Sequence, residues 1–315
     1  MTDRPLIDPA LLERLGSLEL KARYLVEGTL AGLHRSRLVG DNVEFAGHRE
    51  YSPGDDPRRV DWKAYGRLDR WYLKESVDET NAAVHLAVDC SGSMDYPAEA
   101  GLLKDGVVSG GPRKGAGLTK GSFAALLAAC VAAVALDQGD AAGLYAFPLR
   151  RAVMPPKASR VYLRELAAAL ERLTPEGKAS LQAASADLAG MAGRRGIVCF
   201  FSDLLDDDQD ALTSLVQLAR RGHDVTVFHV LDRSEIDFSV SGLTLFIDAE
   251  SERQVLAEPE LLAKAYREEF GRFLDACRSA CVGAGIDYHL AVTDTPPEQV
   301  LRGFLVGRQG RRAGG

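Results

Sequence analysis

The sequence has few cysteines and histidines, and it lacks the spacings that zinc sites and disulfide frameworks use. Its five cysteines include no Cys-x-x-Cys pair, and its six histidines are scattered along the chain. An odd number of separated cysteines in a chain of this length indicates buried thiols in a reducing compartment. These absences exclude a small module that is stabilised by zinc or by disulfides.

Long hydrophobic runs are missing as well. The amino terminus, MTDRPLIDPALLERL, has no basic stretch followed by an apolar stretch, so it predicts no secretory leader. The most apolar run, Phe123–Leu136, is rich in alanine and shorter than the roughly 20 residues that cross a bilayer. We expect it to be a buried core helix. Together with the thiols, these features predict a cytoplasmic protein without a membrane span.

A strong net charge is also absent. The 38 lysines and arginines stand against 45 aspartates and glutamates, a net charge of −7, so the sequence predicts no nucleic-acid partner. Apolar residues make up 46% and charged residues 26%, which is ordinary for a globular protein and excludes a disordered or collagen-like chain. A length of 315 residues suits one large domain or two unequal ones.

The stretch Gly106–Gly121 is rich in glycine but lacks the phosphate-binding motif GxxxxGK[ST]. Lys120 is preceded by Thr119 and followed by Gly121, so the residues around this lysine do not match the motif. We therefore reject nucleotide binding here. We expect the stretch to be a mobile flap beside the candidate site described below.

After Asn81 the pattern of apolar residues alternates between strands and helices. Ala83–Asp89 and Ile197–Asp203 are nearly continuous apolar runs, which are typical of strands covered on both faces. Strands that alternate with helices predict an α/β fold with a doubly wound, mainly parallel sheet and helices on both faces. The other expected strands are Gly143–Phe147, Arg151–Met154 at an edge, Val225–Leu231 and Tyr288–Val292. The expected helices are Ser122–Leu136, Arg160–Leu173, Leu181–Met191, Gln209–Arg221, Pro259–Gly283 and one from Pro296, with a hairpin inserted at Leu243–Val255.

Three parts follow one another along the chain. Residues 1–80 contain an amino-terminal helix, which begins at Asp8-Pro9, and a small β extension that includes a strand at Trp71–Val77. Residues 81–306 form the main α/β domain. We expect the basic, glycine-rich tail 307–315 to be disordered.

The residues best suited to chemistry follow the first central strand. Asp89, Ser91 and Ser93 alternate at its carboxyl end, where ligands bind in doubly wound sheets. One carboxylate and two hydroxyls aimed at one point suit a hard cation such as Mg²⁺, with Mn²⁺ or Ca²⁺ as alternatives, better than a metal that prefers sulfur. Asp203, at the end of another strand, adds a second carboxylate.

These residues resemble the metal-ion-dependent adhesion site of von Willebrand factor A domains, whose signature is Asp-x-Ser-x-Ser with a distant threonine and aspartate. The match is position by position at Asp89, Ser91, Ser93 and Asp203. At the threonine position the closest register places Ala179, so the neighbouring Ser180 is the hydroxyl that the sequence offers as a ligand. The resemblance implies a Rossmann-type domain of that family with Mg²⁺ bound at these residues.

The upstream segment Glu44–Ala64 resembles the hallmark of the domain-of-unknown-function 58 family. It reads EFAGHREYSPGDDPRRVDWKA, and the resemblance extends from Arg35 to Val292. The family consists of bacterial proteins with a von Willebrand A-like domain, typically found beside MoxR-type AAA+ ATPases. The resemblance implies a non-enzymatic adaptor that works with such an ATPase and binds client proteins by admitting their Asp or Glu carboxylates to the metal.

Two other functions remain open. A Mg²⁺-dependent phosphohydrolase would use Asp89 as its nucleophile, but Ser91 stands where a second carboxylate is expected, which leaves no general acid. The second alternative is a structural protein with a vestigial metal site, because the threonine ligand is missing. A serine hydrolase is not supported, since Cys90-Ser91-Gly92-Ser93 is no GxSxG motif.

Several other conspicuous residues favour packing over function. We interpret Asp206–Asp210 as a helix start rather than a ligand cluster. The segment Asp55–Trp62 is interpreted as a staple between the first two parts of the chain rather than an interaction surface. His85 is expected to be a core histidine, and Cys277 and Cys281 are expected to be packing residues.

Overall fold

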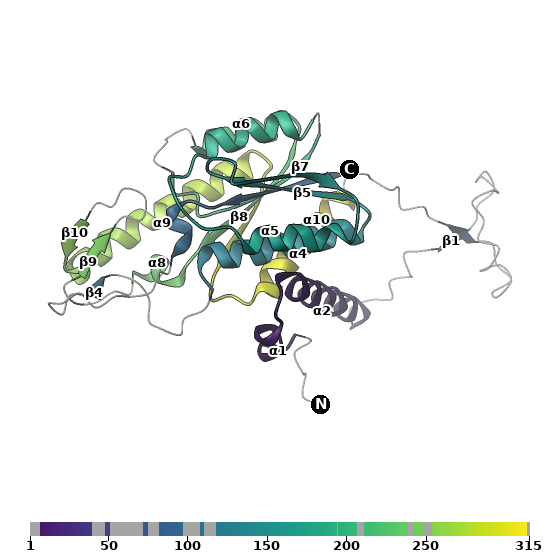
Figure 1. The fold of residues 1–315 in the computed structure, drawn as a ribbon, viewed down its shortest axis with the longest axis horizontal. Helices are drawn as coiled ribbons and strands as arrows, with labels where there is room; N and C mark the ends of the chain where they lie inside the picture. Colours follow the sequence, from purple (N-terminus) through teal and green to yellow (C-terminus); the bar gives the residue numbers. More distant parts are fainter. Residues whose placement is uncertain are drawn as a thin grey trace.

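The computed structural model describes residues 7–39, 48–50, 72–74, 82–96, 108–109, 118–193, 195–206, 211–238, 242, 244–247 and 254–313. Its centre is a six-stranded sheet with helices on both faces (Figure 1). In spatial order the strands are β11 (Asp287–Val292), β8 (Asp224–Leu231), β7 (Ile197–Ser202), β3 (Ala83–Asp89), β5 (Ala141–Phe147) and β6 (Ala152–Lys157). Every neighbouring pair is parallel except β5 and β6, which pair antiparallel at one edge. The predicted α/β fold with a mainly parallel sheet is confirmed, and it is compatible with a Rossmann-like fold.

The inner strands form because their residues are apolar on both sides. In β3 every residue from Val84 to Asp89 is buried, and in β7 every residue from Val198 to Ser202 is buried. Such strands need cover on both faces, as parallel sheets have. β6 instead alternates between half-buried and exposed residues. Its Pro155 and Pro156 suit an edge, because proline cannot donate a hydrogen bond to a neighbouring strand.

One face of the sheet packs against a core that is built around α4 (Lys120–Asp137). Every residue of the alanine-rich run Phe123–Leu136 is buried, so the prediction of a core helix there is confirmed. This helix is long and apolar enough to cross a membrane, but 83% of it is buried inside the fold, as is usual for a core helix. The helices that pack with it on this face are α2 (Leu18–Val39), α5 (Tyr162–Glu171) and α10 (Pro297–Ala313).

The opposite face carries a second core. Cys277 and Cys281 are fully buried in it, which agrees with their interpretation as packing residues. Figure 1 shows α6 on the side of the sheet away from α4 and α5. The helices of this face are α6 (Leu181–Met191), α7 (Ala211–Arg220) and α9 (Pro259–Gly283).

The amino-terminal helix begins at Pro9, as predicted, but it is divided into α1 (Pro9–Arg14) and α2. Gly16 lies in the break, and glycine is a poor helix former. The hydroxyl of Ser17 then accepts a hydrogen bond from Leu20 N at 3.3 Å, which caps the start of α2. Three residues of α2 join the core of the main sheet: Ala22, Leu25 and Val26.

A smaller three-stranded sheet lies at one end of the molecule (Figure 1). Its order is β10 (Gln254–Ala257), β9 (Thr244–Ile247) and β4 (Val108–Ser109). β9 and β10 pair antiparallel, which confirms the predicted hairpin insertion. The short helix α8 (Arg233–Asp237), which precedes the hairpin, was not expected from the sequence.

The small β extension of the amino-terminal part is described only in pieces. β1 (His48–Glu50) and β2 (Tyr72–Lys74) pair antiparallel, and β2 lies within the strand expected at Trp71–Val77. The hallmark residues on either side of β1, including the segment Asp55–Trp62, lie outside the described residues. The same holds for most of the stretch Gly106–Gly121.

At the carboxyl end the prediction of a disordered tail from Gly307 is wrong, because α10 continues to Ala313. Arg308 explains the extra helical turns. Its guanidinium pairs with Asp224 Oδ2 at 3.3 Å and lies 5.6 Å from the ring centre of Phe304. The ion pair attaches Arg308 to β8, while the ring contact lies within α10.

The order of the strands reverses at β3. From there the chain goes to β5 and β6 on one side and then returns to β7, β8 and β11 on the other. Ligands of doubly wound folds bind outside the carboxyl ends of the strands at such a switch point. Here the switch point lies between Asp89, the last residue of β3, and Ser202, the last residue of β7.

Candidate functional site

Asp89 is buried at the end of β3, with 1% of its surface exposed. Its Oδ1 accepts a hydrogen bond from Ser91 N at 2.9 Å, and its Oδ2 accepts one from the hydroxyl of Ser202 at 2.6 Å. The Ser202 oxygen in turn accepts a hydrogen bond from Leu204 N at 3.0 Å. These bonds fix the carboxylate and tie the end of β3 to the end of β7.

The two serines of the Asp-x-Ser-x-Ser pattern have adjacent hydroxyls. Ser91 Oγ and Ser93 Oγ lie 3.1 Å apart. The chain bends at this point because Gly92–Asp95 forms a short 3-10 helix. The hydroxyls therefore come together beside the Asp89 carboxylate, as alternating positions after a strand would allow.

Neighbouring loops hold this turn from two sides. Cys90 N donates to Phe147 O, at the end of β5, at 2.6 Å. Gly92 N donates to Gly177 O at 2.8 Å, and Glu176 N donates to Cys90 O at 2.7 Å. The loop before α6 therefore lies against the Asp89–Ser93 turn. This loop contains Ala179 and Ser180, the predicted threonine position.

Asp203, the residue after β7, is fully buried. Its Oδ2 accepts a hydrogen bond from Lys120 Nζ at 2.8 Å, and its Oδ1 accepts one from Leu205 N at 3.1 Å. Its charge acts on Asp89 across the gap between the two strand ends. Asp89, Ser91, Ser93 and Asp203 thus lie together at the switch point.

Lys120, the first residue of α4, is a residue of this site that the sequence analysis did not identify. It is fully buried, and its ammonium also donates to Glu235 Oε1 at 2.6 Å. Burial alone would lower the pKa of Lys120, but the charges of Asp203 and Glu235 outweigh burial and hold that pKa above its usual range. The lysine is therefore a fixed positive charge between two carboxylates.

Glu235 reaches Lys120 because α8 begins with a capping box. The Asp232 side chain accepts a hydrogen bond from Ser234 N, and Glu235 Oε2 accepts one from Asp232 N at 2.8 Å. Burial raises the pKa of Glu235, although Lys120 opposes that shift. The sequence Asp232-Arg-Ser-Glu235 carries this signal, so the short helix and its glutamate were open to prediction.

His229 holds the backbone of Asp203 in place. Its Nε2 lies 2.8 Å from Asp203 O, and its Nδ1 lies 2.7 Å from the hydroxyl of Tyr288. A carbonyl oxygen can only accept, so Nε2 carries the proton and Nδ1 accepts from Tyr288. Burial lowers the pKa of His229 to about 4, so the ring is neutral.

The buried carboxyl of Asp89 lies in surroundings that disfavour its charge. Burial and then the charge of Asp203 raise its pKa from 3.8 to about 7, against the hydrogen bonds from Ser202 and Ser91. A positive charge placed beside Asp89 would remove both costs. The electrostatics of this position therefore favour a cation.

Ser180, the predicted substitute for the threonine ligand, caps α6. Its Oγ accepts a hydrogen bond from Ala183 N at 3.3 Å, and no hydrogen bond within the described part of the chain joins it to Asp89, Ser91, Ser93 or Asp203. Asp206 acts at the same helix start, because its Oδ2 accepts from Leu181 N at 2.9 Å. Asp206 therefore does lie at a helix start, as predicted, but the helix is α6 and not the one that follows Asp206 in the chain. The other acids of 207–210 lie outside the described residues.

The donors at the switch point are mixed. Among the described residues, no group of three or more His, Cys, Asp or Glu could hold a metal ion, which excludes a site built from those side chains alone. The oxygens available are the carboxylates of Asp89 and Asp203 and the hydroxyls of Ser91 and Ser93. Mg²⁺ binds oxygen and keeps several waters, so this set of donors fits it or a similar hard cation.

A family model described as "Protein of unknown function DUF58" matches residues 47–279. The chain is 26% identical over 284 residues to the uncharacterized protein Mb1516 of Mycobacterium bovis, covering 86% of this chain and 83% of that protein. It is equally similar to the uncharacterized protein Rv1480 of Mycobacterium tuberculosis.

Two solved structures from Bacteroides are similar at low sequence identity. The conserved hypothetical protein BatB of Bacteroides thetaiotaomicron is 14% identical with a TM-score of 0.43, covering 73% of this chain and 99% of that one. An aerotolerance-related membrane protein of Bacteroides fragilis is 16% identical with a TM-score of 0.40, covering 68% of this chain and 92% of that one.

Proposed function

The chain belongs to the DUF58 family of proteins of unknown function, and we propose that it is a protein-binding adaptor with a von Willebrand factor A-like domain. Its binding site is a metal-ion-dependent adhesion site that takes Mg²⁺, or Mn²⁺ or Ca²⁺. The adaptor works in the cytoplasm with a MoxR-type AAA+ ATPase and presents client proteins to it. It has no catalytic activity of its own.

One observation carries this proposal: two buried aspartates end neighbouring strands at the switch point, and two serine hydroxyls 3.1 Å apart lie beside one of them. Asp89, Ser91, Ser93 and Asp203 would hold the cation. When bound, the metal supplies a partly open coordination position that a carboxylate of the partner can fill. Ser180 is a candidate ligand only if its hydroxyl leaves the helix start that it caps.

The chain's own residues prepare the site for this role. Ser202 and Ser91 N orient Asp89, while His229 fixes the backbone of Asp203. Lys120 balances part of the negative charge on the β7 side. The site is therefore held in one geometry before the partner arrives, which lowers the cost of ordering on binding.

The first test is metal binding by the purified protein. Thermal unfolding in Mg²⁺, Mn²⁺, Ca²⁺ and EDTA should show a metal-dependent rise of the midpoint temperature for the wild type. Asp89→Asn keeps the shape of the side chain and should lose that rise. A wild-type midpoint that is the same in EDTA and in 10 mM of each cation counts against the metal site and supports a structural protein with a vestigial site.

The second test is recognition of the partner. The wild type and Asp89→Asn are immobilised, and the ATPase encoded by the same organism is passed over them in Mg²⁺ or in EDTA. We expect capture of the ATPase by the wild type in Mg²⁺ alone. Equal capture under all conditions places the contact on another surface of the molecule.

A phosphohydrolase is the second candidate, and Lys120 is the observation that favours it. A lysine beside a strand-end aspartate, with Mg²⁺ at a neighbouring aspartate, could stabilise phosphate charge. However, the ammonium is fully buried between Asp203 and Glu235, and Ser91 still occupies the position of the missing general acid. Hydrolysis of p-nitrophenyl phosphate in Mg²⁺, absent in Asp89→Asn, would establish the enzyme and overturn the adaptor.

A further inference from the structure

The turn between β5 and β6 holds two consecutive non-glycine residues in the left-handed region. The φ angle is 63° at Leu149 and 51° at Arg150. L-amino acids other than glycine avoid this region because Cβ approaches the following carbonyl oxygen. Leu149 also exposes 84% of its surface, so its side chain gains little from burial. Leucine therefore strains the backbone at this position, and burial of its side chain offsets little of that cost.

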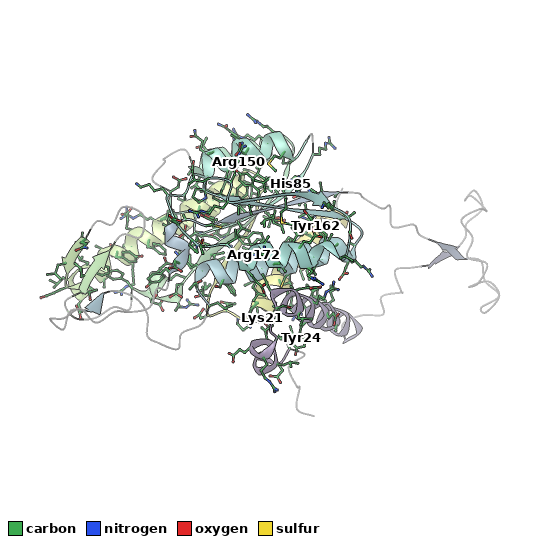
Figure 2. All side chains as sticks on the ribbon, viewed as in Figure 1. Lys21, Tyr24, His85, Arg150, Tyr162 and Arg172 are labelled. Carbon is green, nitrogen blue, oxygen red and sulfur yellow. The ribbon has the colours of Figure 1, made fainter. Side chains whose placement is uncertain are left out.

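Two ion pairs made by the residues that follow Leu149 keep the turn in this conformation. The guanidinium of Arg150 makes two hydrogen bonds to Asp187 of α6, with Nε 2.7 Å from Oδ2, and Figure 2 shows Arg150 beside α6. The hydroxyl of Tyr145 donates to the same carboxylate at 2.5 Å. The next residue, Arg151, pairs with Glu176 Oε2 at 2.9 Å. The exposed side chain of Leu149 therefore projects from a turn that these contacts hold in place.

The turn lies on the rim of the candidate site. Phe147 is the register partner of Asp89, and Phe147 O accepts the hydrogen bond from Cys90 N. The turn also lies against the loop before α6, because Pro148 Cγ is 3.8 Å from the position that a Cβ atom would take on Gly177. The spacing of strands and the reach of two residues put the Cα of Leu149 within about 12 Å of the Cα of Asp89.

Exposure alone would not single out Leu149. Single exposed apolar residues are common, and Val161 is 75% exposed. Val161, however, has φ −68° in ordinary helical backbone and lies between β6 and α5, at the end of the sheet away from Asp89. Leu149 differs in combining exposure, left-handed backbone and a place beside the site.

We infer that Leu149 is an apolar contact for the protein partner that the metal site captures. The inference rests on the proposed function for the acidic part of the partner and adds a second feature to it. An extended peptide advances about 3.3 Å per residue, so 12 Å corresponds to three or four residues. The partner segment therefore carries an Asp or Glu with a large apolar side chain about three residues away.

The first measurement is stability. Leu149→Gly removes the side chain and relieves the left-handed strain, so its thermal midpoint should rise by about 1 to 3 °C. Val161→Ala is the matched control for loss of an exposed apolar side chain away from the site. A structural role for Leu149 would give the opposite sign, and a fall of the midpoint in Leu149→Gly overturns the inference.

The second measurement is binding of short fluorescent peptides by the wild type, Leu149→Gly and Val161→Ala, in Mg²⁺ and in EDTA. All peptides consist of Gly and Ser around one Asp, and one series adds a Phe three residues from it. We expect the wild type and Val161→Ala to bind the Phe series about tenfold more tightly than the plain series. Leu149→Gly should bind the two series equally.

The outcomes separate this inference from the proposed function. Binding that needs Mg²⁺ but shows no gain from Phe, or a gain that survives in Leu149→Gly, overturns the role of Leu149 alone. A gain from Phe that depends on Leu149 but persists in EDTA supports the apolar contact and contradicts the metal-dependent adaptor. No binding of any peptide by the wild type overturns both.

Discussion

The two halves of the candidate site stabilise their carboxylates in different ways. In the β3 half, the donors to Asp89 among the described residues are hydroxyl and amide groups, from Ser202 and Ser91. In the β7 half, Asp203 shares the buried ammonium of Lys120 with Glu235. Both aspartates are buried at the ends of neighbouring parallel strands, so their environments differ in charge rather than in depth.

This difference indicates where a ligand can act. The β7 half contains its own cation, and its buried charges are paired with good geometry, which is what such a pair needs in order to be stable. The β3 half has no such cation among the described residues, and burial and the charge of Asp203 raise the pKa of Asp89. A divalent cation at the switch point would therefore interact mainly with the β3 half and with the serines beside it.

The largest expected effect comes from removing the cation of the β7 half. Lys120→Met leaves Asp203 and Glu235 buried without a counter-charge, which usually costs about 3 to 5 kcal/mol. We expect the free energy of unfolding at pH 8, measured by urea denaturation, to fall by this amount. The loss should be smaller at pH 5, since burial raises the pKa of Glu235 and protonation of that carboxylate removes one unpaired charge.

Two controls accompany Lys120→Met. Adding Glu235→Gln to it removes one of the unpaired charges and should restore part of the stability. Lys264→Met removes an exposed lysine, 88% of whose side chain is accessible, and should change the free energy of unfolding by less than about 0.5 kcal/mol. A Lys120→Met protein as stable as the wild type would mean that the two halves do not differ as described.

The next effect belongs to the β3 half and has the opposite sign. The folded-state pKa of Asp89 is about 7, above the ordinary value of 3.8, so the folded protein binds the proton more tightly than the unfolded chain does. Stability of the wild type therefore falls as the pH rises from about 4 to 7, and the penalty stays constant above that range. Without divalent cations, Asp89→Asn should be more stable than the wild type at pH 8 by about 2 to 4 kcal/mol.

The pH dependence is the control for Asp89→Asn. The gap between variant and wild type should close at about pH 3, where Asp89 is mostly protonated in both folded and unfolded states. Mg²⁺ at pH 8 should also narrow the gap, because only the wild type gains stability from it. A gap that is the same at pH 3 and pH 8 would show that ionisation of Asp89 is not its cause.

Most of the main sheet could be predicted because its strands are covered on both faces. β3 and α6 have the bounds that the apolar pattern indicated, and the bounds of β7 and β8 differ by one residue. The periodicity of apolar residues did not predict the break at Gly16 and Ser17, where local residue preferences end one helix and start the next. It also did not predict the length of α10, to which the contact of Arg308 with the distant Asp224 contributes. A single sequence contains no pattern that reports such contacts.

The site was predictable to the same extent. Asp89, Ser91 and Ser93 follow a recognisable strand at a fixed spacing, and Asp203 follows another. Lys120 was missed because its two partners lie 83 and 115 residues away in the chain. A lysine at the start of a strongly apolar helix was the available sign, since a buried lysine requires a partner.

The smallest expected effect tests whether the loop before α6 belongs to the β3 half of the site. Ser180→Ala removes the hydroxyl that caps α6 and should lower the free energy of unfolding by about 1 kcal/mol. Asp206, which also accepts a hydrogen bond at this helix start, is unchanged and limits the loss.

Because the hydroxyl serves the helix, the rise of the midpoint temperature of Ser180→Ala in Mg²⁺ should equal that of the wild type. A smaller rise would identify Ser180 as a metal ligand and add the loop before α6 to the β3 half. Ala179→Thr is the companion variant, and a larger rise than in the wild type would locate the missing ligand at position 179 instead.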